Sequence, residues 1–164
     1  MKDIGAWILV GVAALAIVGA LLGPSETEPR PAPAFSLVNL DGDVVSLADF
    51  EGRVVLLDFW ASWCKPCVKT FPALHEIHDA LADQGVDLLV VSLDKSAEDS
   101  ISYLTENGYA TDNVLWGSLA EARAVRDLYE VVGIPHSFVI DRTGIIRYSG
   151  HPVHLSIDTV EPWL

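Results

Sequence analysis

The stretch Asp58-Phe59-Trp60-Ala61-Ser62-Trp63-Cys64-Lys65-Pro66-Cys67 decides the fold and the chemistry, and it holds both cysteines of the chain. A disulfide framework in a small secreted fold needs several bridges between distant positions. A structural zinc site needs four ligands, usually a second cysteine pair or two histidines. Neither pattern accompanies Cys64 and Cys67, so we expect a redox-reactive pair and no metal.

The cysteines lie at a turn from a predicted strand into a predicted helix. The run Val54–Trp60 is apolar apart from Asp58, as in a central strand that is covered on both faces. After the cysteines, apolar residues recur every three or four positions up to Leu81, which predicts a helix. Pro72 falls inside that helix and predicts a kink or a local break.

This placement assigns a role to each sulfur. At the start of a helix, unpaired N–H groups and the helix dipole stabilise a thiolate. Cys64 is therefore expected to attack, and Cys67, one turn later and more buried, to resolve the mixed disulfide. Pro66 suits an early helical position, and Lys65 adds a positive charge, so both are expected to tune the redox pair.

The remaining pattern alternates strands and helices. Val86–Leu93 reads as a second buried strand, and Ala97–Asn107 as a helix that ends at Gly108. A helical stripe and two hairpins complete the pattern, which predicts an α/β fold with a mixed sheet covered by helices. The stripe consists of Leu119, Ala122, Val125 and Leu128, and the hairpins are Phe35–Ser46 around Asp41-Gly42 and Ser137–Tyr148 around 141–144.

The N-terminal region predicts a membrane anchor. Ile4–Gly23 holds no charged side chain, and at about 1.5 Å per residue it can cross a hydrocarbon core of about 30 Å. The alternative is a signal peptide cleaved near Ala20. We expect residues 1–23 to form the anchor (or an uncleaved signal), 24–33 a Pro-rich extended linker and 34–164 the folded domain, outside the cytoplasm.

Composition restricts the partners. The chain carries 23 Asp and Glu against 10 Lys and Arg, a formal charge of −13. Such a surface repels phosphate backbones, so nucleic acid is not expected as a partner.

The Trp-Cys-x-Pro-Cys core with the preceding Phe-Trp-Ala-Ser resembles the active-site segment of the thioredoxin superfamily. Residues 133–141 resemble the loop that carries the cis-proline in this superfamily. With the entry segment Ala34–Leu37 and the predicted anchor, the chain is most similar to the membrane-anchored TlpA/ResA/CcmG-like branch. The resemblance implies a thioredoxin-like three-layer fold, with a central mixed sheet flanked by helices.

The resemblance also implies roles for residues around the cysteines. Pro135 becomes the cis-proline, the backbone of Ile134 pairs with substrate chains, and Trp63 offers them an apolar contact. Asp58 becomes a buried acid that moves the proton of Cys67 through water. The alternative for Asp58 is a strand-end carboxylate bonded to backbone.

The implied function is an extracytoplasmic thiol–disulfide oxidoreductase that acts on protein substrates and needs no cofactor beyond its disulfide. The branch implies a reductant, supplied by a transmembrane electron donor, in cytochrome c maturation or copper-site assembly. Two alternatives share the fold: a copper-binding metallochaperone and a peroxiredoxin-like peroxidase.

Some features depart from the family pattern or stay open. Little chain follows Gly150, so the last helix is expected to be short or absent. Asp94-Lys95 stands near a family glutamate but receives no role. His75 and His78 read as half-exposed polar positions, and His151 and His154 as surface loop. His136 follows Pro135, where a protonated imidazole could stabilise a thiolate.

Overall fold

The computed structural model describes residues 28–164. The predicted anchor, Ile4–Gly23, lies outside the described residues, as do residues 24–27 of the predicted linker. Across residues 28–164, no helix has both the length and the apolar character that crossing a membrane requires.

A six-stranded mixed sheet forms the centre, in the order β1-β8-β7-β4-β5-β6. The central strand β4 runs parallel to β5 and antiparallel to β7. Every residue of β4 is buried, as its continuous apolar run predicts. The strands are β1 (Arg30–Pro31), β4 (Val54–Trp60), β5 (Val86–Ser92), β6 (Val114–Leu115), β7 (His136–Ile140) and β8 (Ile145–Gly150).

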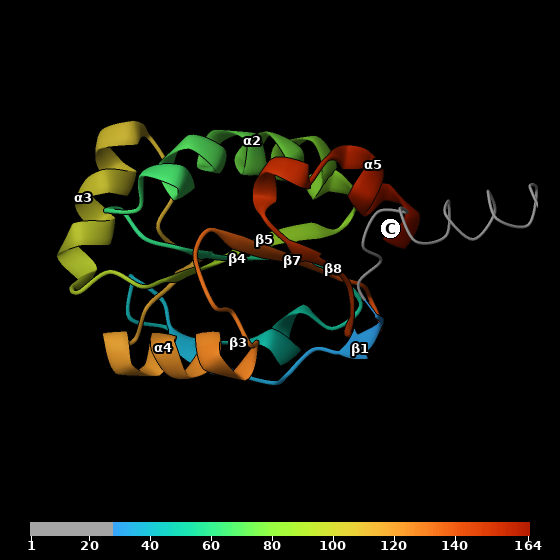
Figure 1. Cartoon of the computed structure of the whole chain (residues 1–164), viewed down its shortest axis with the longest axis horizontal. Coiled ribbons are helices and arrows are strands. Elements are labelled where there is room, and N and C mark those ends of the chain that lie inside the picture. Colours follow the sequence, from blue (N-terminus) through green and yellow to red (C-terminus); the bar gives the residue numbers. More distant parts are fainter. Residues whose placement is uncertain (1–27) are drawn as a thin grey trace, which may run out of the picture.

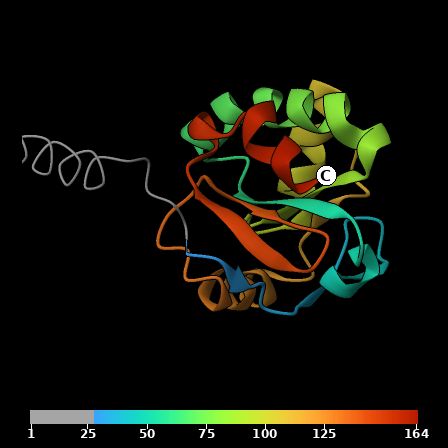
Figure 2. The same cartoon turned by 90° about the vertical axis from the view of Figure 1, so that its right-hand side faces the viewer.

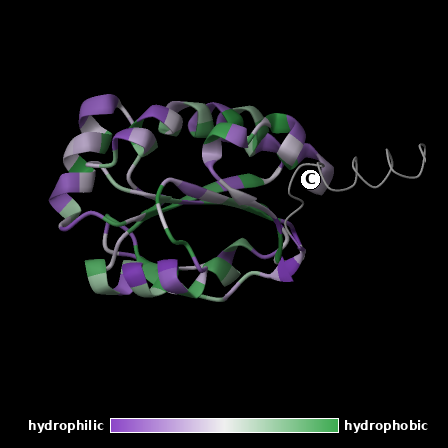
Figure 3. Cartoon of the chain, viewed as in Figure 1, coloured by the Kyte–Doolittle hydropathy of each residue, from purple (hydrophilic) through white to green (hydrophobic). Residues whose placement is uncertain are grey.

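Helices cover the sheet on both faces and give the three predicted layers (Figure 1). Helices α2 (Lys65–Leu81), α3 (Ala97–Asn107) and α5 (Ile157–Val160) lie on one side. Helix α4 (Leu119–Leu128) lies on the other, with the predicted hairpin of β2 (Ser36–Val38) and β3 (Val44–Ser46). Figure 2 shows the same layers from the side, and Figure 3 shows hydrophobic strands between helices whose outer faces are hydrophilic. Short 3₁₀ helices are η1 (Leu47–Phe50), η2 (Ala82–Gln84), η3 (Pro152–His154) and η4 (Glu161–Trp163).

Helix α2 forms because its apolar stripe packs on the sheet. The buried stripe consists of Cys67, Phe71, Leu74, Ile77 and Leu81. The local break predicted at Pro72 does not occur, since the helix runs through it. Proline removes one backbone hydrogen bond, but Pro72 is exposed, and buried side chains hold the helix on either side of it.

Both ends of the described chain join the sheet. Arg30 pairs with Ile146 in β8, so part of the range expected as linker forms an edge strand. After β8 the chain ends in α5 and η4, and the last helix is short, as predicted. The Arg147 guanidinium lies 4.6 Å from the centre of the Trp163 ring, which fixes this end on the sheet.

Candidate active site

Cys64 and Cys67 are joined by a disulfide with an S–S distance of 2.03 Å. Strand β4 ends at Trp60, and Cys64 is the N-cap of α2. The Cys64 Sγ accepts a hydrogen bond from the backbone N–H of Cys67 at 3.2 Å. The predicted turn from strand to helix is therefore confirmed, and the backbone of the first helical turn points a donor at the sulfur.

This geometry favours a thiolate at Cys64 once the disulfide is reduced. The Cys67 N–H and the N-terminus of α2 both stabilise negative charge on the Cys64 sulfur. Cys64 keeps 5% of its surface exposed and Cys67 none, so a substrate sulfur can reach only Cys64.

The two residues between the cysteines are both exposed. Pro66 occupies the first turn of α2, where its missing N–H removes no helical hydrogen bond. Lys65 takes part in no ion pair within residues 28–164. Its ammonium group is therefore free to act on the neighbouring sulfur or on an approaching partner.

Asp58 is a buried carboxyl in the middle of β4, with 2% of its surface exposed. Its Oδ1 accepts a hydrogen bond from the Ser137 hydroxyl at 2.6 Å. Burial raises the pKa of Asp58 to about 7, and the bond from Ser137 opposes that rise only in part. An acid with such a pKa can accept and return a proton near neutral pH. The Asp58 carboxyl thus bonds a side-chain hydroxyl, and not a backbone group as the alternative predicted.

The loop before β7 lies against the disulfide. The Ile134–Pro135 peptide bond is cis, as predicted. The Ile134 carbonyl oxygen lies 3.8 Å from the Cys64 Sγ, so the structure brings a segment 70 positions along the chain to the redox pair. Trp63 is 62% exposed beside this loop, which agrees with an apolar contact for partners.

A second buried acid, Asp94, lies next to the active-site loop, at a position whose sequence pattern indicates no role. Its carboxylate accepts hydrogen bonds from the hydroxyls of Ser62, Ser92 and Ser100 at 2.7–3.1 Å. It also accepts from the Ser62 backbone N–H at 3.1 Å. Asp94 therefore holds the turn between β4 and Cys64. The contact depends on tertiary structure: Trp60 pairs with Ser92 in parallel strands, so the residues after each strand end meet at one sheet edge.

Replacing Asp94 with alanine is expected to lower the free energy of unfolding by about 3 kcal/mol or more, because it leaves several buried donors without an acceptor. Asp94→Asn keeps the volume and one acceptor oxygen, so its loss should be smaller. Urea unfolding measures both changes. Asp112→Asn, at an exposed turn, is the control and should change little. A loss below about 0.5 kcal/mol in Asp94→Ala would contradict the anchoring role.

Three of the histidines contact other protein groups. His75 bonds the Phe71 carbonyl at 3.0 Å, and His78 lies 3.3 Å from the Asp79 carboxylate. His136 Nε2 bonds the Ser149 hydroxyl at 2.9 Å. Burial, together with nearby His151, lowers the pKa of His136, which disfavours the protonated imidazole considered above. In residues 28–164 no cluster of three or more His, Cys, Asp or Glu side chains could hold a metal ion.

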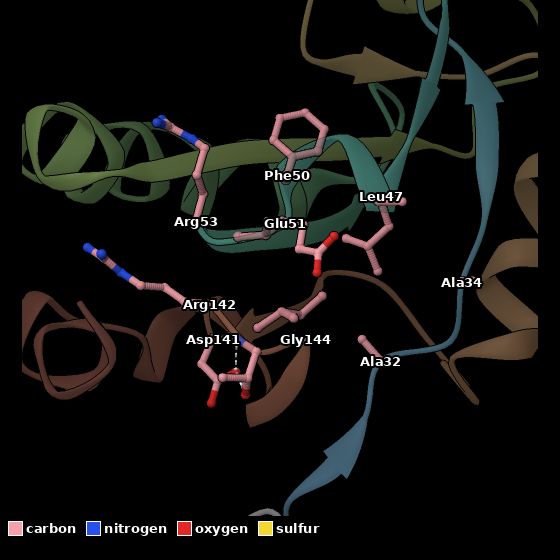
Figure 4. A pocket seen from close by; sticks show the side chains of 13 residues that line it. Ala32, Ala34, Leu47, Phe50, Glu51, Arg53, Asp141, Arg142 and Gly144 are labelled. Carbon is pink, nitrogen blue, oxygen red and sulfur yellow. Dashed lines mark hydrogen bonds between the residues drawn. The ribbon is translucent and has the colours of Figure 1, made fainter.

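A separate hollow of about 260 Å³ lies at the other end of β4, around Arg53 and Val55 (Figure 4). Apolar side chains, the cations Arg53 and Arg142 and the acids Glu51 and Asp141 line it. Both cations have protein partners: Arg53 pairs with Asp87, and Arg142 donates to the Gln84 carbonyl. Strand β4 separates this hollow from the cysteines by about 20 Å, given about 3.3 Å per residue, so it is not part of the redox site.

A family model described as AhpC/TSA matches residues 29–149. The chain belongs to the AhpC/TSA family. The match begins just before β1 and ends within β8. It therefore covers the sheet up to Ser149, both cysteines and the cis-proline loop.

Two relatives of the chain carry related names. The chain is 32% identical over 120 residues to the "Thioredoxin-like protein YneN" of Bacillus subtilis, covering 73% of this chain and 69% of that protein. It is 32% identical over 120 residues to the "Thiol-disulfide oxidoreductase ResA" of the same species, covering 73% and 65%. The chain thus spans about two thirds of the length of these curated relatives.

A solved structure shows the same fold. A putative thiol:disulfide interchange protein DsbE from Chlorobium tepidum superposes with a TM-score of 0.69 at 34% identity, covering 77% of this chain and 86% of that one. A thiol:disulfide interchange protein from Bacteroides sp. gives 0.72 at 31% identity, covering 85% and 91%. With the Cys64–Cys67 disulfide, these likenesses place this AhpC/TSA member among the thioredoxin-like thiol–disulfide oxidoreductases.

Proposed function

We propose that this chain reduces disulfides of proteins outside the cytoplasm, while Ile4–Gly23 holds it at the membrane. The observation that carries the redox part is the Cys64–Cys67 disulfide at the N-terminus of α2, in which Cys67 is fully buried and Cys64 keeps 5% of its surface exposed. Buried Asp58 and the cis-Pro135 loop complete the arrangement. The Cys64–Cys67 pair itself carries two electrons as a dithiol and gives them up when it closes to the disulfide, so the exchange needs no separate cofactor.

The proposed reduction of a substrate disulfide takes two steps. The Cys64 thiolate attacks a substrate disulfide, forms a mixed disulfide and releases one substrate sulfur as thiolate. Cys67 passes its proton to Asp58 and attacks the Cys64 sulfur. This closes the Cys64–Cys67 disulfide and releases the second substrate sulfur. Two electrons pass to the substrate, whose sulfurs take up the protons, and a dithiol donor then reduces the disulfide again.

The reductive direction is tested by the midpoint potential of the Cys64–Cys67 pair. Equilibration with dithiothreitol and glutathione series should give a value nearer to thioredoxin, about −270 mV, than to strong oxidants at about −120 mV. A midpoint near the oxidants would show that the chain inserts disulfides rather than removing them. Since the donor must reach the outer face, we propose a transmembrane protein in that role.

The location is tested with the full chain in a bacterial host. The full chain should stay with the membrane fraction in alkaline carbonate, and a chain that begins at Glu28 should not. Protease added outside the cytoplasmic membrane should digest the domain of the full chain. Protection of the domain would reverse the proposed orientation.

The two alternatives predict different reactions. A copper-binding role predicts copper retained in a fixed ratio and lost in His136→Ala or His151→Ala. No described cluster of ligands favours it. A peroxidase role predicts consumption of peroxide by the reduced chain, and we expect none.

A further inference from the structure

We propose that the substrates of this site are polypeptides with acidic residues beside the cysteine that Cys64 attacks. The proposal rests on the function proposed above and names its substrate class. It concerns a groove that borders the redox pair, here called the Trp63 groove. Its lining residues are Trp63, Leu93, Arg123, Arg126, Gly133 and Ile134.

The groove lies where a bound chain meets the reactive sulfur. Trp63 precedes Cys64, and the Ile134 carbonyl lies 3.8 Å from the Cys64 Sγ. The groove has a volume of about 270 Å³, enough for one or two side chains. A second hollow, lined by Ser62, Trp63, Lys95 and Asp99, lies on the Ser62 side of the same indole. A polypeptide that crosses Trp63 therefore contacts both hollows.

Positive charge gathers around Trp63 although the chain is strongly acidic. Of the chain's 10 Lys and Arg, Arg123 and Arg126 line the groove and Lys95 lines the second hollow. Arg123 and Arg126 are one helical turn apart on α4, and the neighbouring Ala122 and Val125 are buried. Because Ala122 and Val125 pack into the core, Arg123 and Arg126 lie together at the edge of α4 that borders the groove.

Within the described residues, most of these cations form no ion pair. Neither Arg123 nor Lys95 takes part in one across residues 28–164. Arg126 lies 2.5 Å from the Asp127 carboxylate, a pair exposed enough to contribute little. Asp99 is the other acid at these hollows. With Lys65 beside Cys64, cations outnumber acids here, whereas acids dominate the rest of the chain.

The apolar part of the site defines the rest of the substrate. Trp63 is 62% exposed, and Val132 in the cis-proline loop is fully exposed. These side chains accept an apolar residue next to the substrate cysteine, and Leu93 forms part of the groove. Acidic side chains on either side of that residue can then reach Arg123 and Lys95. Charge complementarity of this kind mainly raises the rate of association and selects partners.

Three disulfide-bridged peptides, identical except for Glu, Gln or Lys beside the cysteines, test the proposal. The full chain, reduced and solubilised in a neutral detergent, should reduce the Glu peptide about tenfold faster than the Lys peptide at about 10 mM salt. The preference should shrink at about 0.5 M salt because the charges are screened. In the double variant Arg123→Glu, Arg126→Glu the order of the Glu and Lys peptides should reverse.

Two controls separate the possible failures. The double variant Arg53→Glu, Arg142→Glu changes the net charge equally but at the distant hollow, and should keep the preference for the Glu peptide. Reduction of the neutral bis(2-hydroxyethyl) disulfide reports the redox chemistry alone and should be the same in the native chain and in the Arg53→Glu, Arg142→Glu variant. If that disulfide is not reduced, the proposed function fails, and this assignment with it. If it is reduced but the peptides react equally, or the Lys peptide fastest, only the acidic specificity is overturned.

Discussion

A reduced Cys67→Ser variant should accumulate a covalent complex with its substrate, while Cys64→Ser should accumulate none. The structure gives the reason, because Cys64 is the sulfur with exposed surface and Cys67 is fully buried. Serine at position 67 leaves the first attack intact but cannot close the disulfide. The mixed disulfide on Cys64 is then stable until an external thiol releases it.

The two variants should also differ in rate. Cys64→Ser removes the nucleophile that the Cys67 N–H stabilises, so reduction of a protein disulfide should fall to background, a loss of at least about 1000-fold. Cys67→Ser should give one rapid turnover and then stop. Non-reducing gels and mass spectrometry identify the complex, and rapid mixing measures the single turnover.

A matched pair of outcomes decides the assignment. If Cys64→Ser traps complexes and Cys67→Ser does not, Cys67 is the attacking sulfur and Cys64 the resolving one. The double serine variant is the control, since any complex that it forms does not arise from this pair.

Asp58→Asn should remove a pH dependence of stability that the native chain shows between about pH 4 and pH 7. Burial raises the pKa of Asp58 from 3.8 to about 7, so the folded chain binds this proton more tightly than the unfolded chain. Ionisation therefore opposes folding. The native chain loses stability as pH rises through this window, and the loss stays constant above it.

The size of the effect follows from the shift in pKa. About three units correspond to a loss on the order of 4 kcal/mol, complete near pH 7. The asparagine side chain of the variant cannot ionise, and its amide oxygen can still accept the Ser137 hydroxyl, so the variant should lack this slope. Urea unfolding of the oxidised form at about pH 4 to 8 measures it. An equal slope in both proteins would mean that Asp58 does not carry the raised pKa.

Ser137→Ala should raise the pKa of the Asp58 carboxyl further. The hydroxyl lowers the pKa of Asp58 against the larger effect of burial, so its removal should move the pH window upward.

The proposed transfer of the Cys67 proton to Asp58 predicts a change in rate as well. In Asp58→Asn the attack of Cys67 on the mixed disulfide should slow about 100-fold near pH 7, with little change in the first attack.

The layers of this fold could be read from the sequence because local patterns specify them. The uninterrupted apolar run of β4 requires cover on both faces, and the stripe of α2 supplies one cover. Pro72 shows the limit of local rules. Its effect on backbone bonding predicts a kink or a local break, and the break does not occur because packing of the buried stripe keeps the helix continuous.

The sequence by itself determined the redox pair, its place at the start of α2 and the buried acid, because adjacent residues set all three. Only the tertiary structure showed that Asp94 holds Ser62 and that Arg123 lies beside Trp63. These contacts join segments far apart along the chain, and the local spacing of apolar residues does not specify which strands pair or which strand ends meet. The chemistry at Cys64 was thus encoded locally, whereas its surroundings depend on parallel strand pairing and on how α4 packs.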